Sequence, residues 1–237
     1  MSAVSESIAT AVGLIADADP ALVRIVVLSF AVSGTACFVA AGIGLVAGAW
    51  LAAARFAGSR LVLIVLDTLL ALPAVVVGLV VYLGLSRSGP LGAWGILFTP
   101  TAMVIAQTIL VLPIIAALAR QVVADALREG GDQLRSMGAG RLVAALLMLL
   151  HERWAVATLL LAAFGRAISE VGTVMIVGGN IDGVTRVMTT AIALETSKGN
   201  LPLALALGFI LLAVVALLNA VIALVPHGRS VVAAEIR

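Results

Sequence analysis

Five long apolar segments with very few charged residues limit what this chain can fold into. Three of them contain no charged residue, and the other two contain only Asp67 and the pair Arg166 and Glu170. About 20 such residues in a helix cross the hydrocarbon of a bilayer, whereas strands of a membrane barrel are about half as long and alternate polar with apolar residues. The sequence therefore predicts an all-α integral membrane protein with five transmembrane helices. The predicted spans are residues 25–54, 61–85, 99–119, 154–177 and 201–225.

Composition excludes a soluble domain. Of the 237 residues, 63% are hydrophobic and 11% are charged, whereas soluble domains carry roughly a quarter charged residues. No linker or internal repeat divides the chain, so residues 1–237 are predicted to form a single transmembrane domain. The single Cys37 cannot form an internal disulfide. The first twenty residues contain acidic but no basic residues, which is the wrong charge for a signal peptide. We expect the first span to be retained and residues 7–15 to form a short surface helix.

The distribution of cationic residues predicts the orientation of the spans. With the N-terminus outside, nine arginines lie on the inner side, against three arginines and the single lysine on the outer side. Inner loops carry an excess of Lys and Arg in membrane proteins, so we predict an outer N-terminus and an inner C-terminus. The net charge of +2 reflects this topology and does not indicate nucleic-acid binding. The inner set is Arg55, Arg60, Arg120, Arg128, Arg135, Arg141, Arg153, Arg229 and Arg237, and the outer set is Arg24, Arg87, Arg186 and Lys198.

Small and cyclic residues inside the spans predict local features. Ala40, Gly44 and Gly48 share one helix face and favour close approach of a second helix, either from this chain or from a second copy. Pro73 and Pro113 lie inside predicted spans and should each kink a helix. Thr99 followed by Pro100 is typical of a helix start.

The inner loop 120–153 is the most highly charged part of the chain. Its apolar run of nine residues, 142–150, is about 14 Å of helix and too short to cross a bilayer. We therefore expect inner-side helices with a charged face, and long loops are usually functional. The face is interpreted as a docking surface for a cytoplasmic partner, the alternative being a solvated loop. Its candidate residues are Asp125, Arg128, Glu129, Asp132, Arg135 and Gly138.

This loop resembles the cytoplasmic EAA loop of ABC importer permeases. The family pattern is Glu-Ala-Ala, three residues, Gly, nine residues, then Ile-x-Leu-Pro. Asp132 begins the stretch that takes the Glu-Ala-Ala position, Gly138 takes the Gly position, and Met148, Leu150 and His151 take the Ile, Leu and Pro positions. Asp for Glu, the two missing alanines and His for Pro are departures from the pattern.

Two further stretches resemble tungstate permeases, a branch of the molybdate and sulfate type of ABC importers. They are AFGRAISEVGTVMIVGGNIDGVTRVMTTAIALETSKGN (163–200) and LDTLLALPAVVVGLVVYLGLSRSGPLG (66–92). The resemblance implies a multi-pass type I importer permease of a bacterial or archaeal plasma membrane. It implies a homodimer that works with two ATPase subunits and an extracytoplasmic oxyanion-binding protein. Tungstate is the implied substrate, with molybdate or sulfate as alternatives.

The chain lacks the phosphate-binding motif G-x-x-x-x-G-K-[ST], and its only lysine, Lys198, is in an outer loop. The resemblance therefore implies that ATP and Mg²⁺ are bound by the partner ATPase and that this chain carries no cofactor, metal or catalytic residue. Movement of the inner loop would rock the spans between outward-open and inward-open states.

The pair Arg166 and Glu170 lies in the middle of a predicted span, where an unpaired charge costs several kcal/mol. On a continuous helix, Ser169 and Thr173 would share its face. The pair is interpreted as a structural lock between helices, the alternative being that Arg166 attracts the transported dianion and Glu170 tunes it. Asn180, which follows the span, has a side chain that suits an oxyanion or an ordinary polar loop equally.

The residues of the spans also bear on two other functions. An intramembrane protease needs Ser with His, or two Asp, within the spans, and this chain has one Asp and no His there. An ion-coupled secondary transporter could use Arg166 and Glu170, but it would not need the charged inner loop.

Overall fold

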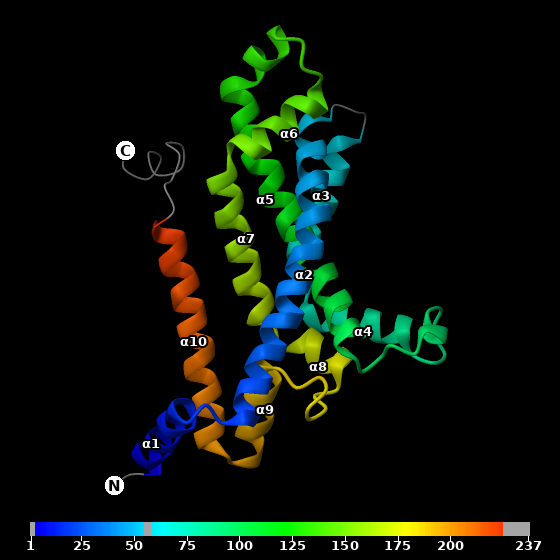
Figure 1. The fold of residues 1–237 in the computed structure, drawn as a ribbon. Helices are drawn as coiled ribbons and strands as arrows, with labels where there is room; N and C mark the ends of the chain where they lie inside the picture. The colour runs from blue at the N-terminus through cyan, green and yellow to red at the C-terminus, as the bar shows by residue number, and fades with distance from the viewer. Residues whose placement is uncertain (1–2, 55–57, 225–237) are drawn as a thin grey trace. The chain divides into compact units, whose positions relative to one another are not determined.

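The computed structural model describes residues 3–54 and 58–224, and of residues 3–7 only the backbone. The predicted inner residues Arg55, Arg229 and Arg237 lie outside this range. The described chain is helical and contains no strand (Figure 1). Its helices are α1 (Ala3–Ala16), α2 (Pro20–Ala53), α3 (Ser59–Leu70), α4 (Ala74–Leu85), the short 3-10 helix η1 (Gly92–Trp94), α5 (Pro100–Ser136), α6 (Arg141–His151), α7 (Arg153–Ile168), α8 (Gly172–Gly178), α9 (Met188–Lys198) and α10 (Leu201–Leu224).

The chain divides into two compact units. The first contains Met1–Ala36, Pro73–Ile109 and Gly165–Leu217, and the second contains Cys37–Leu72, Leu110–Phe164 and Leu218–Arg237. Buried apolar side chains form a core in each unit. In the first unit α2, α5 and α8 contribute Val32, Met103 and Val174. In the second unit α2, α5 and α6 contribute Ala49, Val123 and Ala145.

Among the helices in the described part of the chain, three are long and apolar enough to cross a membrane, or up to five spans are possible if each of two broken helix pairs counts as one. The three are α2, α5 and α10, which match the first, third and fifth predicted spans. The pairs are α3 with α4 and α6 with α7. The all-helical membrane fold is thus confirmed, whereas the count of five and the orientation stay predictions.

Local helix starts follow the sequence signals. Thr99 Oγ1 accepts a hydrogen bond from the backbone N–H of Ala102 at 3.4 Å, and Pro100 is the first residue of α5. Asp19 Oδ1 accepts hydrogen bonds from Ala21 N at 2.9 Å and Leu22 N at 3.0 Å, so α2 begins at Pro20, before the predicted residue 25. Both caps satisfy amide groups that a helix leaves without partners.

Three of the predicted spans differ in extent from the helices of the structure. Residues 61–85 are two helices, α3 and α4, because the chain leaves the helical path from Ala71 to Pro73. Residues 154–177 are also two helices, interrupted at 169–171. The helix of the third predicted span does not end at residue 119: α5 contains Pro113 and continues to Ser136, so the first half of the inner loop belongs to the same helix.

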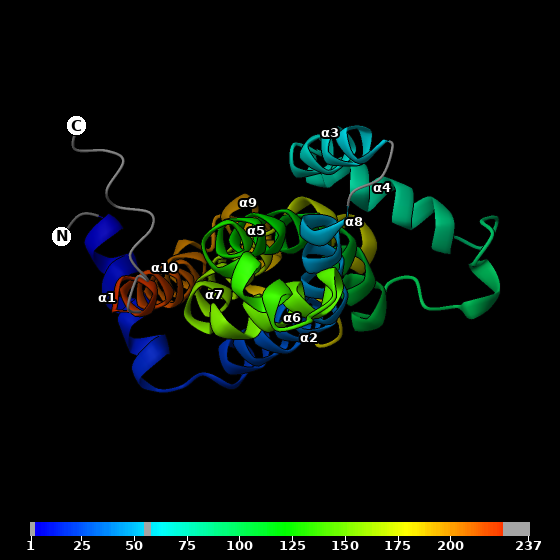
Figure 2. The same cartoon turned by 90° about the horizontal axis from the view of Figure 1, so that it is seen from above.

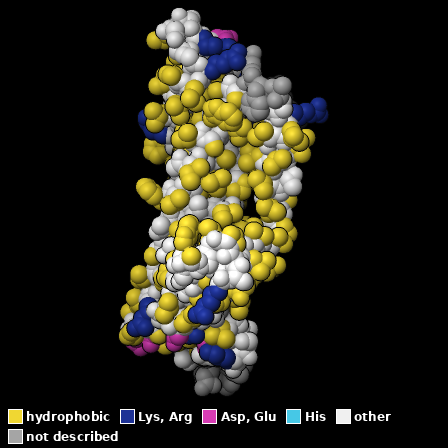
Figure 3. Space-filling model, turned by 90° about the vertical axis from the view of Figure 1, so that its right-hand side faces the viewer, with side chains coloured by type: hydrophobic (Ala, Val, Ile, Leu, Met, Phe, Trp, Pro, Cys, Tyr) yellow, Lys and Arg dark blue, Asp and Glu magenta, His cyan; other side chains and the backbone are white. Residues whose placement is uncertain are grey.

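Many large apolar side chains are exposed. On α10, Leu212 is 67% exposed and Leu217 is 66% exposed. Figure 3 shows hydrophobic side chains over much of one face, with charged side chains few among them. An exposed apolar surface of this extent indicates contact with lipid or with other proteins.

The glycines of α2 provide the closest helix contact of the second unit. A Cβ on Gly44 would lie 2.9 Å from Ile115 Cγ2, and one on Gly48 would lie 2.5 Å from the carbonyl oxygen of Ala116. The partner of the Ala40-Gly44-Gly48 face is therefore α5 of the same chain. The sequence could not decide this, because small residues show that a helix approaches and do not show which one.

Replacing Gly48 by Ala is expected to destabilise the second unit. Its methyl group would meet the backbone of α5, and overpacking of this kind typically costs about 1–3 kcal/mol. Gly42→Ala is the matched control, because Gly42 is exposed on the same helix with no atom within 4 Å of the position that a Cβ would take. Thermal unfolding in detergent should show a lower midpoint for Gly48→Ala and no decrease for Gly42→Ala. Equal midpoints would contradict the close α2–α5 contact.

Candidate functional site

The interruption between α7 and α8 is organised by Glu170. Its Oε2 accepts a hydrogen bond from Arg166 Nη1 at 2.5 Å, so the predicted pair is present. Its Oε1 accepts from the backbone N–H groups of Gly172 at 3.0 Å and Thr173 at 3.4 Å. The carboxylate therefore joins the last turn of α7 to the first turn of α8. A negative charge at a helix N-terminus also interacts favourably with the helix dipole.

Neighbouring helices donate hydrogen bonds to the backbone carbonyls at the interruption. The carbonyl oxygen of Ala167 accepts from the backbone N–H of Glu170 at 3.1 Å and also from Gln107 Nε2 of α5 at 3.0 Å. The carbonyl oxygen of Glu170 accepts from Thr189 Oγ1 of α9 at 2.7 Å. Gln107 and Thr189 are both buried. Non-helical backbone at membrane depth is tolerated where protein covers it in this way, so the interruption is a built feature of the first unit.

The four residues predicted to share one helix face do not do so, because the helix is broken between them. Arg166 and Glu170 meet, but only Arg166 is substantially exposed, with 45% of its side chain accessible against 6% for Glu170. Thr173 is completely buried and donates to the carbonyl oxygen of Ala74 at 2.7 Å, which ties α8 to α4. Ser169 is exposed and donates back to the carbonyl of Gly165 in α7. Figures 1 and 2 both show α4 beside α8.

Asn180 lies in the turn that follows α8. It has a positive φ of 51° and follows Gly179, whose φ is 70°. Its Nδ2 donates to the carbonyl of Thr190 at 3.3 Å, and Thr185 Oγ1 donates to the carbonyl of Gly178 at 2.6 Å. These contacts fit the interpretation of this stretch as a polar loop.

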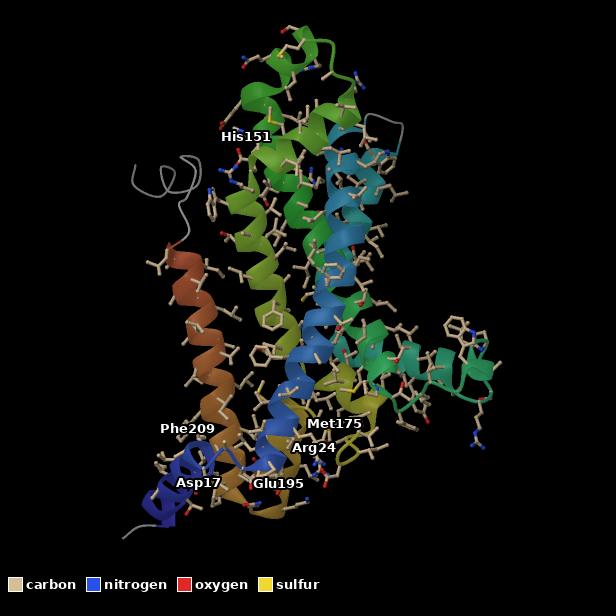
Figure 4. All side chains as sticks on the ribbon, in the orientation of Figure 1. Asp17, Arg24, His151, Met175, Glu195 and Phe209 are labelled. Atoms are coloured by element: carbon tan, nitrogen blue, oxygen red, sulfur yellow. The ribbon has the colours of Figure 1, made fainter. Side chains whose placement is uncertain are left out.

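Two groupings were missed by sequence reasoning. Ser29 of α2 accepts a hydrogen bond from the N–H of Met188 at 2.8 Å, which fixes the start of α9. Glu195 of α9 is buried and accepts from Lys198 Nζ at 2.9 Å and from Asn200 Nδ2 at 3.0 Å; Figure 4 labels Glu195. The pKa of Glu195 is lowered below its ordinary value of 4.5, mainly by the hydrogen bond from Lys198. Burial of the carboxyl group raises the pKa, whereas Asn200 and the positive charge of Arg186 lower it further. The i, i+3 spacing of Glu195 and Lys198 was the available signal.

The charged loop of the second unit is a helical hairpin formed by the end of α5 and by α6. Four of its six candidate residues form exposed ion pairs one turn apart, Asp125 with Arg128 and Asp132 with Arg135. Exposed pairs of this kind contribute roughly 0–1 kcal/mol, so they do not explain why the charges are present. Glu129 is exposed between them. The predicted charged helical face is therefore confirmed as a structure, and its docking role stays a prediction.

Gly138 allows the hairpin to turn. Its φ is +90°, and the N–H of Ala139 bonds to the carbonyl of Leu134 at 3.0 Å, which closes the C-terminus of α5. Only glycine adopts this backbone conformation without a steric cost. The hairpin packs on itself through Gly130, where a Cβ would lie 2.9 Å from Met148 Cε.

Two grooves flank the hairpin. One, of about 350 Å³, lies between Ala52 and Ala53 of α2, the α5 residues Arg128, Asp132 and Arg135, and Arg141 of α6. The other, of about 440 Å³, includes Glu129, Gln133, His151 and Glu152. Each groove is lined by both charged and apolar residues.

Comparison with known proteins identifies the family. No family model matches the chain. The chain is 42% identical over 222 residues, covering 94% of it and 97% of the relative, to the tungstate uptake system permease protein TupB of Peptoclostridium acidaminophilum. It is 45% identical over 204 residues, 84% of the chain and 88% of the relative, to a probable anion ABC transporter permease protein of Haloferax volcanii. The chain belongs to the ABC transporter permeases.

A putative molybdenum transport system permease protein, YvgM of Bacillus subtilis, is 30% identical over 76% of the chain and 82% of the relative. ABC importer permeases work with ATPase and binding-protein partners and are not catalytic themselves, so this chain is a transport subunit and not an enzyme. The multi-pass membrane location predicted from the sequence agrees with this family and with the apolar helices.

Gly138→Ala is expected to destabilise the hairpin, because a left-handed conformation costs a residue with a side chain about 1–2 kcal/mol. Gly140→Ala is the matched control, since Gly140 has a φ of −65° and a Cβ added to it would meet no atom within 4 Å. Limited proteolysis of the purified permease should cleave the hairpin of Gly138→Ala faster than that of Gly140→Ala. Equal cleavage would show that the turn does not depend on glycine.

Glu195 is expected to stabilise the first unit in a pH-dependent way. Because its folded-state pKa is lowered, its contribution is complete above about pH 4.5 and is lost as the pH falls through the folded-state pKa. At pH 7, Glu195→Gln should therefore unfold at a lower temperature than the native chain. The difference between the two unfolding temperatures should shrink as the pH of the buffer is lowered. A difference that grows towards low pH would contradict the ion pair.

Proposed function

We propose that this chain is the permease of an ATP-driven tungstate importer in a bacterial or archaeal plasma membrane. The observation that carries the proposal is the similarity over almost the full length of both chains to a protein named as a tungstate uptake permease. The relatives named for molybdenum and sulfate are 30% and 31% identical over smaller shares of the chain. Molybdate and sulfate are therefore the alternative substrates.

The working unit that we propose contains two copies of this chain, two ATPase subunits and an extracytoplasmic oxyanion-binding protein. ATP and Mg²⁺ are bound by the ATPase, in keeping with the absence of a phosphate-binding loop from this sequence. Each permease copy crosses the membrane five times, with the N-terminus outside. The exposed apolar side chains of α10 supply surface for lipid and for the second copy.

The hairpin is proposed to connect the ATPase to the membrane spans. α5 is one helix of 37 residues, about 55 Å long, which exceeds the roughly 30 Å of bilayer hydrocarbon. Its charged end, from Asp125 to Arg135, is therefore expected to extend beyond the hydrocarbon. When the nucleotide sites close, a displacement of the hairpin acts on α5 and changes the side on which the pathway is open.

We propose that Arg166 and Glu170 act as a structural lock. Glu170 is almost completely buried and binds three donors, from Arg166 and from two amides of α8. A buried carboxylate with this set of partners fixes the geometry of the interruption and leaves no oxygen open to a second cation. A permease that receives its substrate from a binding protein also needs no tight site of its own, since strong binding slows release.

The proposed function is tested by reconstitution. Proteoliposomes that contain the permease and its ATPase, with the binding protein outside, should accumulate tungstate only with internal ATP. Molybdate and sulfate are then added as competitors, and weaker competition by both supports tungstate as the substrate. Tungstate uptake driven by an ion gradient through the permease alone would overturn the importer proposal in favour of a secondary transporter.

Arg166→Ala is expected to unfold at a lower temperature than the native permease, because it removes the charged partner of buried Glu170. The cost should be about 1–3 kcal/mol, and ATPase stimulation and tungstate uptake should decrease together. Replacing both residues, Arg166→Ala with Glu170→Gln, should recover part of this loss, which a double-mutant cycle on the unfolding midpoint measures. Arg87→Ala, at an exposed position, is the control. Loss of uptake with native stability and native ATPase stimulation would assign Arg166 to the pathway.

A further inference from the structure

The N-terminal helix α1 is separated from the first span by a defined corner. The backbone N–H of Asp19 bonds to the carbonyl of Leu14 at 3.2 Å, and Ala18 has a positive φ of 47°. The same Asp19 then caps α2 through its side chain. A non-glycine residue in the left-handed region carries a steric cost, so the corner is specified by these contacts. α1 therefore turns away from α2 and does not extend it, as Figure 1 shows.

α1 has one face that protein covers and one apolar face that it does not. Ala11 is completely buried, and α1 lies beside α10 in both ribbon views (Figures 1 and 2). Ile8, Val12 and Ile15 are 40%, 54% and 37% exposed. Their spacing of four and three residues places them in one stripe along the helix. Thr10, which is also exposed, falls on the opposite side of the helix from Val12.

The apolar stripe continues onto the first span. Just beyond the corner, Val23 is 41% exposed and Val27 is 61% exposed. An apolar groove of about 720 Å³ runs along this part of α2, from Ala18 and Pro20 to Ala31. α2 is long and apolar enough to cross a membrane and the chain belongs to the ABC permeases, so we expect its exposed valines to face lipid. The stripe on α1 is thus adjacent to an apolar surface that is suited to contact with the bilayer.

We propose that α1 lies in the membrane interface, with Ile8, Val12 and Ile15 inserted among lipid acyl chains where α2 enters the bilayer. Its 14 residues make about 21 Å of helix, too short to cross, and a helix with one apolar stripe and one polar side lies in the plane of the interface. Three aliphatic side chains are also far less than the roughly 800 Å² that each partner buries in a stable protein interface. A second copy is therefore a weaker candidate for the occupant of this stripe.

The charge of the segment specifies how the contact is made. Residues 3–19 contain Glu6, Asp17 and Asp19 and no lysine or arginine. Interfacial helices that bind anionic headgroups carry basic residues on their polar side. α1 is therefore held by burial of apolar side chains, and its insertion should not depend on the fraction of anionic lipid.

The proposal is tested on the complete transporter in lipid nanodiscs. In a Cys37→Ala background, Val12→Cys is labelled with an environment-sensitive fluorophore, and Thr10→Cys provides the matched control on the opposite side of the same helix. In phosphatidylcholine nanodiscs, the label at position 12 should emit at shorter wavelength and be quenched severalfold more by lipids with brominated acyl chains. The label at position 10 should be quenched by aqueous iodide. The pattern should be the same when phosphatidylglycerol replaces part of the phosphatidylcholine.

Two outcomes overturn the proposal. Equal iodide quenching at positions 10 and 12 would show that the stripe faces water. Protection of position 12 from both iodide and brominated lipid would show that another protein surface covers it. Each labelled variant is checked for ATP-dependent tungstate uptake and for the elution volume of the dimer, to show that the measurement is made on folded transporter. Ile8→Cys repeats the test at a second position of the stripe.

Discussion

A backbone that leaves the helical path inside an apolar protein needs hydrogen-bond partners from side chains, and this requirement governs the fold around Glu170. Between α7 and α8, the carbonyls of Ala167 and Glu170 receive donors from Gln107 and Thr189, and the first amides of α8 are bound by the Glu170 carboxylate. Each of these donors stands on a different helix. The interruption therefore has a stable structure only when α5, α8 and α9 are correctly assembled, because an unsatisfied backbone group costs several kcal/mol where water is absent.

The same chemical group has different tasks in the two units. The ion pair of Arg166 with Glu170 involves a buried carboxylate, so its geometry and its additional hydrogen bonds decide whether the charge is tolerated. The pairs Asp125–Arg128 and Asp132–Arg135 are exposed, and water would satisfy these charges equally well. Their value lies in the charged surface that they present. This contrast supports a structural role for the buried pair and an interaction role for the exposed pairs.

The sequence predicted features that depend on local chemistry and missed those that depend on tertiary partners. Apolar length identified α2, α5 and α10 as helices able to cross a membrane, Thr99 and Pro100 marked the start of α5, and the spacing of Arg166 and Glu170 predicted their contact. The interruption after Ile168 could not be predicted, because residues 169–171 contain no glycine or proline and the donor Gln107 is 60 residues from Ala167. The extension of α5 was missed because hydropathy detects where a helix leaves lipid and not where it ends. The hydrogen bonds of Thr173 to the carbonyl of Ala74 and of Asn180 to the carbonyl of Thr190 also depend on tertiary partners, and a role of either residue in the pathway stays a prediction.

The continuity of α5 relates the two charged regions. One unbroken helix carries Gln107, which holds the carbonyl of Ala167, and also carries the charged end that begins at Asp125. A helix transmits a displacement along its axis more faithfully than a loop does, because its backbone hydrogen bonds are all internal. Under the proposed importer mechanism, movement of the hairpin by the ATPase must therefore either shift Gln107 with the helix or bend α5. A bend is easiest at Pro113, because proline removes one backbone hydrogen bond of the helix. In the first case the Ala167 carbonyl loses or changes one of its two donors, Gln107 Nε2, and keeps the other, the backbone N–H of Glu170. The lock would then be the element whose two arrangements distinguish the open states, with the hydrogen bond from Gln107 made in one state and broken in the other.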